Sequence, residues 1–247
     1  MSNEQYIYGR HPVSELLRSR SREIQQLFLA NGRNERHSDI IRNAQRFSIT
    51  INKVPANALI SMVGNVNHQG VVAVVATFKY CDIDDILQVA KKSDEAPLLL
   101  MLDQIQDPHN LGALIRSAAA LGAHGVIISK DHSCEVNATV VKASAGATAN
   151  IGIARVTNLN RNIEALKKAG LWVIGAAADA AARPLWQADF SLPSIIVIGS
   201  EGSGLRRLVA ANCDVLVHIP MIERIESLNA SVAGAIVLYE ALRQRSK

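Results

Sequence analysis

Polar side chains that could do chemistry gather in three short segments of the C-terminal half. The first segment, residues 107–122, places Asp-Pro-His-Asn before an alanine-rich helix that also holds Arg116. Asp107 or Asn110 can cap this helix, and Gly112 can allow close packing, so these residues also have a purely structural interpretation. Arg116 is harder to explain by packing, because a cation among small alanines needs an acidic or phosphate partner.

Two later segments also combine polar side chains with glycines or with the start of a helix. Residues 197–205 place three glycines after an apolar run, and glycines there allow positive φ angles and close approach of a ligand to the backbone. Their spacing is not the dinucleotide fingerprint, and the chain has no Walker A sequence. In residues 219–234, Ser227 or Asn229 can cap the last helix. Since Ser231 follows them, polar groups remain for another purpose.

The elements that position these segments are predicted by apolar runs alternating with helical patterns. We expect strands near residues 98–105, 125–129, 151–155, 171–177, 194–200 and 215–220, and helices from residue 110 and over 136–145, 157–170 and 227–245. This alternation predicts an α/β fold with a mostly parallel, Rossmann-like sheet covered on both faces. Ligands bind beyond the carboxyl ends of strands in such sheets, and all three segments follow strands.

The first third of the chain has a different charge from the rest. Residues 1–79 hold ten Lys and Arg residues against five acidic ones, and eight of the ten are Arg. Arg suits phosphate because its planar fork bonds two oxygens at once. The pattern predicts a small α/β unit, with helices near 11–20 and 37–47 and strands at 24–30, 49–54 and 71–78. Residues 80–97 are acidic, then basic, and end in Pro97, which predicts a linker with one short helix.

Composition excludes several classes of protein. The chain is 49% hydrophobic and 19% charged, which is typical of a soluble globular protein. No apolar run reaches the roughly 18 residues of a membrane span, and the start lacks the apolar region of a signal peptide. Three cysteines without a paired spacing support neither a disulfide framework nor a zinc site, and the seven histidines show no ligand spacing. We therefore expect a cytoplasmic protein without a metal.

Taken together, residues 110–116, 199–204 and 227–231 resemble the three motifs of the SpoU (TrmH) family of the SPOUT superfamily. Members of this family are RNA ribose 2′-O-methyltransferases. The order and separations of the motifs match, and residues 8–13 and 68–70 resemble parts of the family's small RNA-binding domain. The resemblance implies an RNA substrate-binding domain over 1–79, a linker over 80–97 and a SPOUT catalytic domain over 98–247.

The resemblance also implies properties that the apolar pattern does not show. Family members tie the C-terminal segment into a deep trefoil knot, although knots are rare in general. They bind S-adenosylmethionine in the knot and form obligate homodimers. By resemblance, Gly199, Ile219 and Leu228 line the cofactor pocket through main-chain contacts, and Gly175 borders it. The wide apolar surface of the last helix also favours a dimer.

The resemblance gives the polar residues roles as well. In this family the arginine of the first motif, here Arg116, acts on the ribose 2′-OH as a base or as an electrostatic stabiliser. We favour the stabiliser, because a guanidinium is always charged in proteins and is a poor base. Glu201 is expected to orient Arg116 through an ion pair. Asn110, Ser227 and Asn229 are expected to hold the substrate ribose and the polar ends of the cofactor.

Several alternatives stay open. The whole chain is most similar to the family members that methylate guanosine in 23S rRNA, and the alternatives are a tRNA 2′-O-methyltransferase or a non-catalytic RNA-binding or ribosome-assembly factor. A nucleotide-dependent dehydrogenase is disfavoured by the absent dinucleotide fingerprint. The chain departs from the family before its third motif, where Glu223, Arg224 and Glu226 replace small residues. We expect this loop to close differently over the cofactor.

Overall fold

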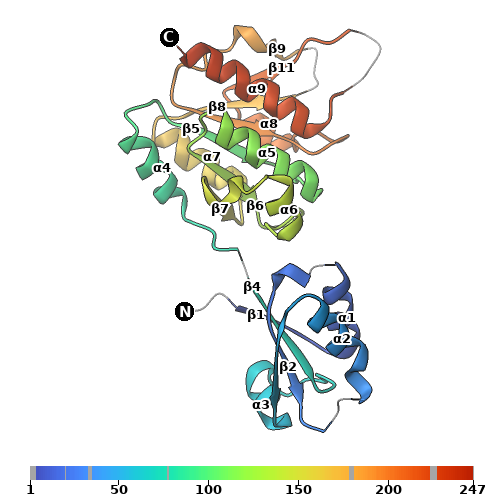
Figure 1. Ribbon diagram of the computed structural model, residues 1–247. Helices are drawn as coiled ribbons and strands as arrows, with labels where there is room; N and C mark the ends of the chain where they lie inside the picture. The colour runs from blue at the N-terminus through green and yellow to red at the C-terminus, as the bar shows by residue number, and fades with distance from the viewer. Residues whose placement is uncertain are drawn as a thin grey trace. The chain divides into compact units, whose positions relative to one another are not determined.

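The chain divides into two compact units, residues 1–79 and 80–247 (Figure 1). The computed structural model describes residues 4–19, 21–32, 35–76, 78–177, 181–222 and 227–246. Over these ranges no helix has both the length and the apolar character needed to cross a membrane.

A four-stranded mixed sheet forms the first unit. Its strand order is β1-β4-β2-β3, and only β2 and β3 run parallel. The bounds are Glu4–Tyr8 for β1, Ile24–Ala30 for β2, Thr50–Val54 for β3 and Val71–Ala76 for β4. Helices α1 (Arg10–Ser19) and α2 (Ser38–Arg46) pack on one face, and α3 (Ala56–Val63) packs on the other. Alternate residues of β4 enter the two cores, because successive strand side chains point to opposite faces.

Part of the segment expected to be a linker is packed into the second unit. Helix α4 (Ile83–Lys92) begins with a capping box between Asp82 and Asp85, in which the Asp82 N–H donates to the Asp85 carboxylate at 3.1 Å. Ile86 is fully buried in the core of the second unit. The burial of this side chain fixes α4 to the sheet, so the second unit begins at Tyr80.

The second unit is built on a seven-stranded sheet in which every pair of neighbouring strands is parallel. The strand order is β7-β6-β5-β10-β8-β11-β9. The bounds are Leu98–Leu102 for β5, Gly125–Ser129 for β6, Gly152–Val156 for β7, Trp172–Ala176 for β8, Arg183–Pro184 for β9, Ser194–Ile198 for β10 and Val215–His218 for β11. The predicted α/β class with a parallel sheet is therefore confirmed. The trefoil knot stays a prediction, because strand order does not specify how the chain passes through a loop.

Helices cover both faces of this sheet. Helix α7 (Leu159–Lys168) and α8 (Arg207–Asn212) join α4 in a core with β5, β8 and β10. Helices α5 (Pro108–Ala120), α6 (Ala138–Ala143) and α9 (Ala230–Arg245) form the other layer, with α5 and α9 side by side (Figure 1). Gly112 allows α5 and α6 to pack closely, since a Cβ there would lie 2.5 Å from the Ala143 Cβ. This confirms the packing interpretation of that glycine.

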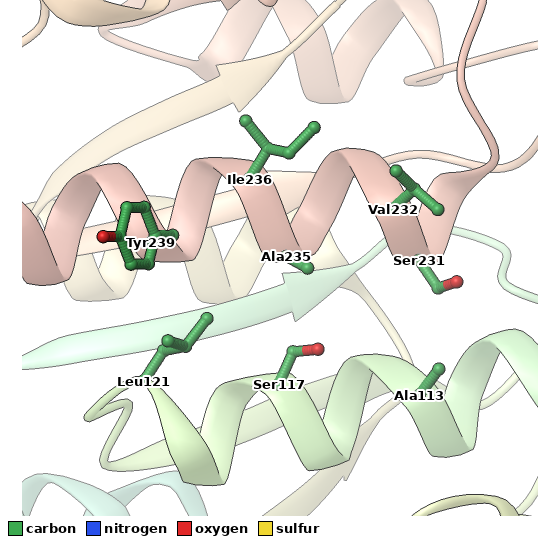
Figure 2. Close-up of a pocket in the computed structure, with 8 residues that line it drawn as sticks. All are labelled: Ala113, Ser117, Leu121, Ser231, Val232, Ala235, Ile236 and Tyr239. Atoms are coloured by element: carbon green, nitrogen blue, oxygen red, sulfur yellow. The ribbon is translucent and has the colours of Figure 1, made fainter.

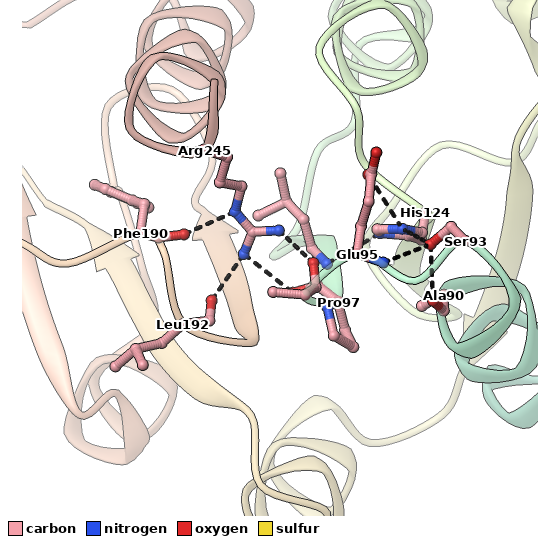
Figure 3. Close-up of polar contacts among 10 residues, drawn as sticks. Ala90, Ser93, Glu95, Pro97, His124, Phe190, Leu192 and Arg245 are labelled. Atoms are coloured by element: carbon pink, nitrogen blue, oxygen red, sulfur yellow. Dashed lines mark hydrogen bonds and ion pairs between the residues drawn. The ribbon is translucent and has the colours of Figure 1, made fainter. Parts of the chain in front are cut away.

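The C-terminal end of α9 is held by one arginine at the amino edge of the sheet. The Arg245 guanidinium donates to the carbonyl oxygens of Phe190 (2.7 Å), Leu192 (2.7 Å), Pro97 (3.2 Å) and Ala96 (Figure 3). These bonds join α9 to the segments that precede β5 and β10. The opposite end of α9, at Asn229, lies at the carboxyl edge of the sheet.

Candidate functional site

Three predicted site residues from three separate segments meet at the carboxyl edge of the sheet. The Asn110 Nδ2 donates to Glu201 Oε1 at 2.9 Å, and the Asn229 Nδ2 donates to Asn110 Oδ1 at 2.9 Å and also to Glu201 Oε1. The Ala230 N–H adds a bond to Glu201 Oε1 at 3.3 Å. We call Asn110, Glu201 and Asn229 the carboxamide network. In the chain, Asn110 lies 91 residues from Glu201 and 119 residues from Asn229.

Helix caps explain why the two asparagines are available for this network. Asp107 caps α5 by accepting from the His109 N–H at 2.9 Å, and Pro108 follows as the first helical residue. Asn110 therefore lies in the first turn with its amide free for Glu201. Asn229 caps α9 through Oδ1, which accepts from the Ser231 N–H at 2.9 Å. This leaves its Nδ2 for the network.

The glycine-rich segment brings Glu201 to the network through a closed turn. Ser200 and Gly204 exchange backbone hydrogen bonds of 3.2 and 2.9 Å, and the Ser200 and Ser203 hydroxyls lie 2.6 Å apart. Gly199 packs directly on the returning backbone, because a Cβ there would lie 2.2 Å from the Gly204 carbonyl carbon. A side chain at 199 would displace the turn that carries Glu201.

An ion pair between buried Asp103 and exposed Arg206, which sequence reasoning missed, anchors the end of this turn. Asp103 is fully buried directly after β5. Its carboxylate accepts from the Arg206 Nε at 2.8 Å and from the Arg206 N–H at 3.0 Å. The available signal was an aspartate that ends an otherwise apolar strand, since a buried carboxylate requires a charged or hydrogen-bonding partner.

A cavity of about 380 Å³ opens beside the glycine-rich turn. It has apolar walls from several strand ends and from the start of α9, formed by Ile198, Leu205, Leu216, Val217, Ile219 and Leu228. Three predicted cofactor residues, Gly199, Ile219 and Leu228, line it, and so does Ser227. We call this space the apolar cavity.

Gly175 does not line the apolar cavity. It is buried within β8, where a Cβ would lie 2.7 Å from Cys213 Sγ and 2.9 Å from both Leu205 and Leu216. Two of these neighbours, Leu205 and Leu216, line the cavity themselves. Gly175 therefore lies behind the wall and supports it, in place of the bordering contact that we expected.

A second cavity, of about 330 Å³, adjoins the first and is more polar. Its walls are formed by two stretches of the chain, Gln104, Ile105, Gln106, Asp107 and Asn110 from the first and Ser200, Glu201 and Ser203 from the second, together with Ala230. Ser200, Glu201, Ser203 and Ala230 also line the apolar cavity. We call this space the polar cavity. Glu201 thus lies on the wall that the two cavities share, Asn110 lines the polar cavity, and Asn229 is bonded to both of these residues.

Arg116 is not brought to this site within one chain. Its side chain is exposed on α5 and lines neither cavity. The expected ion pair with Glu201 is absent from the contacts among the described residues, and that prediction is wrong for the single chain. The Glu201 carboxylate instead accepts from the two asparagines. The predicted loop residues Glu223, Arg224 and Glu226 lie outside the described residues.

An apolar groove runs between α5 and α9 on the surface near Arg116 (Figure 2). Ala113, Ser117 and Leu121 line it from α5, and Ser231, Val232, Ala235, Ile236 and Tyr239 line it from α9. Val232 and Tyr239 are 46% and 60% exposed, which leaves large apolar side chains in water. We call this surface the α5–α9 groove.

Metal and thiol chemistry find little support in the described part of the chain. No group of three or more His, Cys, Asp or Glu side chains that could hold a metal ion occurs there. Burial raises the pKa of the Cys213 thiol to about 12 and raises that of Cys81 as well. Neither thiol is therefore activated as a nucleophile, because the thiolate is the reactive form.

Models of known protein families match both units of the chain. A family model described as "RNA 2'-O ribose methyltransferase substrate binding" matches residues 6–81, and the model of the SpoU rRNA Methylase family matches residues 97–239. The 23S rRNA (guanosine-2'-O-)-methyltransferase RlmB of Pseudomonas aeruginosa is 41% identical, and the alignment covers 100% of this chain and 99% of that protein. A Bacillus subtilis protein named as a TrmH family tRNA/rRNA methyltransferase is 43% identical over 98% of this chain and 96% of its own length.

Solved structures extend the same similarity. The SpoU methyltransferase AviRb of Streptomyces viridochromogenes, in complex with AdoMet, aligns with a TM-score of 0.62 at 28% identity over 98% of this chain and 90% of that chain. An AdoMet-bound rRNA methyltransferase of Sinorhizobium meliloti aligns with a TM-score of 0.63 at 26% identity, covering 99% and 88%. Because its motifs, its parallel sheet and these full-length alignments agree, the chain belongs to the SpoU family of RNA methyltransferases.

Proposed function

We propose that this protein transfers a methyl group from S-adenosylmethionine to the ribose 2′-OH of a guanosine in 23S rRNA. The observation that carries the proposal is the pair of adjoining cavities with Glu201 on their shared wall, where it is bonded to Asn110 and Asn229. The relatives named RlmB support the choice of RNA and nucleoside. We infer that the protein works in the cytoplasm, where ribosomal RNA is found in bacteria.

The apolar cavity fits S-adenosylmethionine. Its apolar walls suit the flat adenine ring, and the Gly199 turn presents backbone without a side chain. Gly199, Ile219 and Leu228 would hold the cofactor, with Gly175 supporting the wall from behind. When bound, the cofactor supplies a methyl group on a sulfonium, which is already a good leaving group. The protein's tasks are then to align the ribose hydroxyl and to manage its proton.

The polar cavity is the space that we assign to the target nucleoside. Asn110, Asn229 and Ser227 would hold the ribose there and the polar ends of the cofactor in the neighbouring cavity. Glu201 fixes both asparagines by accepting from each of them, so their side chains are oriented before any substrate arrives. Glu201 is therefore a positioning residue for the asparagines, which replaces its expected role toward Arg116.

We further propose that the enzyme is a homodimer joined at the α5–α9 groove. A groove with exposed apolar side chains on two neighbouring helices fits a second copy of the same surface. Arg116 borders this groove, since it lies one position before Ser117 and three after Ala113 on the same helix. Covering the groove brings Arg116 against the partner subunit. We therefore assign Arg116 to the partner's site.

In that site the Arg116 guanidinium would stabilise the negative charge that develops on the ribose oxygen. A fixed positive charge does this without losing a proton. The hydroxyl proton then leaves to a nearby RNA phosphate or to water, because a guanidinium does not accept it.

Two measurements test the reaction. Calorimetric titration with S-adenosylmethionine, NAD and ATP is expected to give binding of the first alone. Incubation of the protein and S-adenosylmethionine with unmodified 23S rRNA or tRNA, followed by mapping of 2′-O-methyl groups, is expected to find one guanosine in the 23S rRNA. Methylation of tRNA alone would support the alternative substrate, and binding of RNA without any transfer would support a non-catalytic factor.

A mixed-dimer experiment tests the shared site. Arg116→Ala and Asn229→Ala subunits are each expected to be inactive alone. Heterodimers of the two regain one working site if Arg116 acts across the interface, because the intact arginine and the intact asparagine then meet in one of the two sites. Heterodimers that stay inactive would assign Arg116 to its own subunit.

A further inference from the structure

The polar cavity has two glutamine side chains that the proposed reaction does not use. Gln104 and Gln106 line it together with Ser200 and Ser203. Resting on the proposed function, we infer that these two amides read the edge of the target base and so select guanine. They are specificity-determining residues on this view, and they take no part in methyl transfer itself.

Both amides are available for a ligand. Gln104 is half-buried and Gln106 is exposed, and neither side chain has a hydrogen bond to another described residue. The other polar side chains of this cavity are already engaged. Ser200 pairs with Ser203, Asn110 pairs with Glu201, and Asp107 caps α5. Among the polar side chains that line this cavity, Gln104 and Gln106 are thus the two without a partner among the described residues.

The backbone at Gln104 adds a second observation. Its φ angle is +60°, in the left-handed region that glycine adopts readily and other residues adopt at a cost. Such strain has a free-energy cost and persists where the surroundings enforce it. Glycine would remove this cost, yet the chain carries a long amide at this position. A role for the side chain accounts for that choice.

The segment that carries the two amides is held on both sides. Asp103, directly before Gln104, is fixed by its bonds to Arg206. Ile105, between the two glutamines, is buried, and its carbonyl oxygen accepts from the Cys134 N–H at 2.8 Å. The amides therefore project from a fixed backbone, which is the arrangement that selective hydrogen bonding requires.

The chemistry of the two amides matches guanine. Each amide offers one acceptor oxygen and two N–H donors. The Watson–Crick edge of guanine offers two neighbouring donors, N1–H and the 2-amino group, beside the O6 acceptor. Two amides can satisfy all three groups at once, whereas adenine and the pyrimidines offer fewer or differently ordered groups. Proteins read RNA bases at these edges in unpaired segments, where the base can turn out of its stack.

The test pairs a change in the protein with a change in the base. An RNA fragment carries at the mapped position either guanosine or inosine, which lacks the 2-amino group. Wild type, Gln104→Gly, Gln106→Ala and the double variant are compared by kcat/KM on both RNAs. The matched control is Gln88→Ala, which removes an exposed glutamine of α4 that lines neither cavity. Gln104→Gly should fold normally, because glycine takes the left-handed backbone without strain.

The wild type is expected to prefer guanosine over inosine by about 10-fold to 100-fold, the range of one good bidentate contact. This preference should fall toward one in the double variant, because guanosine loses a bond to its 2-amino group that inosine never makes, while affinity for S-adenosylmethionine is unchanged. Gln88→Ala should retain the full preference. An unchanged preference in the double variant, equal wild-type turnover of both RNAs, or loss of cofactor affinity in the variants would each overturn the inference. Failure of the proposed function would look different, because the wild type would then methylate neither RNA.

Discussion

The two ends of α5 lie in opposite environments. At its amino end, Asn110 is 9% exposed and bonded to side chains from two other segments. Two turns further on, Arg116 is exposed, and the groove beside it is open. One helix thus carries a network residue that is bonded within a single chain and an expected site residue that is not.

The first sequence motif contains both Asn110 and Arg116, but their different environments indicate two different tasks. The carboxamide network is built from the chain's own turns and is preorganised, so it can position a ribose without further help. The α5–α9 groove exposes apolar side chains and a cation, which need a partner surface and an anion. On the proposal above, a second subunit supplies the surface and the reacting oxygen supplies the negative charge. The following predictions test this separation.

The largest effect is expected from Arg116→Ala. The variant should lose about 100-fold to 1000-fold in kcat, the usual cost of removing one electrostatic stabiliser of a developing oxyanion. Folding and affinity for S-adenosylmethionine should be unchanged, because Arg116 has no bond to another described residue and lines neither cavity. The dimer should persist, because the apolar side chains of the α5–α9 groove are intact. Radiolabelled methyl transfer and calorimetry measure the two properties separately. Turnover near the wild-type value would remove Arg116 from the mechanism.

A charge placed in the groove should break the dimer. Ile236→Asp puts a carboxylate among apolar side chains, and its desolvation disfavours association of two copies. Light scattering after size-exclusion chromatography should report a monomer with little or no methyl transfer and an unchanged fold. Leu208→Asp is the matched control, since Leu208 is 58% exposed on α8 and does not line the groove. A fully active monomer would contradict the shared site.

A smaller loss is expected when the network is perturbed inside one chain. Glu201→Gln keeps an acceptor for Asn110 and Asn229 but removes the charge that strengthens those bonds. We expect kcat/KM to fall by about 10-fold, and the free energy of unfolding to fall by about 1 kcal/mol, the size of one hydrogen bond. The dimer should persist in this variant. Steady-state kinetics and urea unfolding measure the two losses, and a monomeric Glu201→Gln protein would refute the separation of network from groove.

Much of the fold was predictable from the sequence, because the buried strands are continuous apolar runs. β6 lies at the predicted residues, and β5, β8 and β10 lie within theirs. The short elements were missed. β9 has only two residues, and β1 and α3 in the first unit, Glu4–Tyr8 and Ala56–Val63, have weak periodicity. Their formation depends on packing against strands distant in sequence, which a local pattern does not encode.

The site was only partly predictable, for a related reason. Residue types and spacing selected Asn110, Glu201 and Asn229, and the turns bring them together. The spacing of the residues could not predict which side chain donates to the Glu201 carboxylate, because a carboxylate accepts equally well from an amide or a guanidinium. The distance of Arg116 from the network follows from helix geometry, since six residues carry it about 9 Å along the axis. Gly175 supports the cavity wall from behind because the cavity lies beyond Leu205 and Leu216. The packing of the neighbouring strands decides this placement, and a local sequence pattern does not encode it.

The smallest effect is expected from a change at His124, which lies at the amino edge of the sheet, away from the carboxamide network and the α5–α9 groove. The His124 Nδ1 accepts from the Leu98 N–H at 3.1 Å, so the proton lies on Nε2, which faces the Ser93 hydroxyl at 2.9 Å (Figure 3). Burial lowers the pKa of His124. Protonation of the ring would put a second proton on Nδ1, where it would displace the bond from Leu98.

This arrangement predicts an acid-sensitive contribution to stability. Because the pKa of His124 is lower in the folded state than its unfolded value of about 6.5, the unfolded chain binds more protons. Stability is therefore retained above that unfolded value and is lost as the pH falls through the folded pKa. His124→Gln keeps an acceptor for Leu98 and cannot titrate, so the loss of unfolding free energy between pH 7.5 and 5.5 should shrink, by about 1 kcal/mol or less. Urea unfolding at the two pH values measures it, with the exposed His109→Gln as control. Methyl transfer and the dimer should be unchanged at pH 7.5, because His124 lines neither cavity nor the groove; reduced turnover there would show that the two edges of the sheet are coupled.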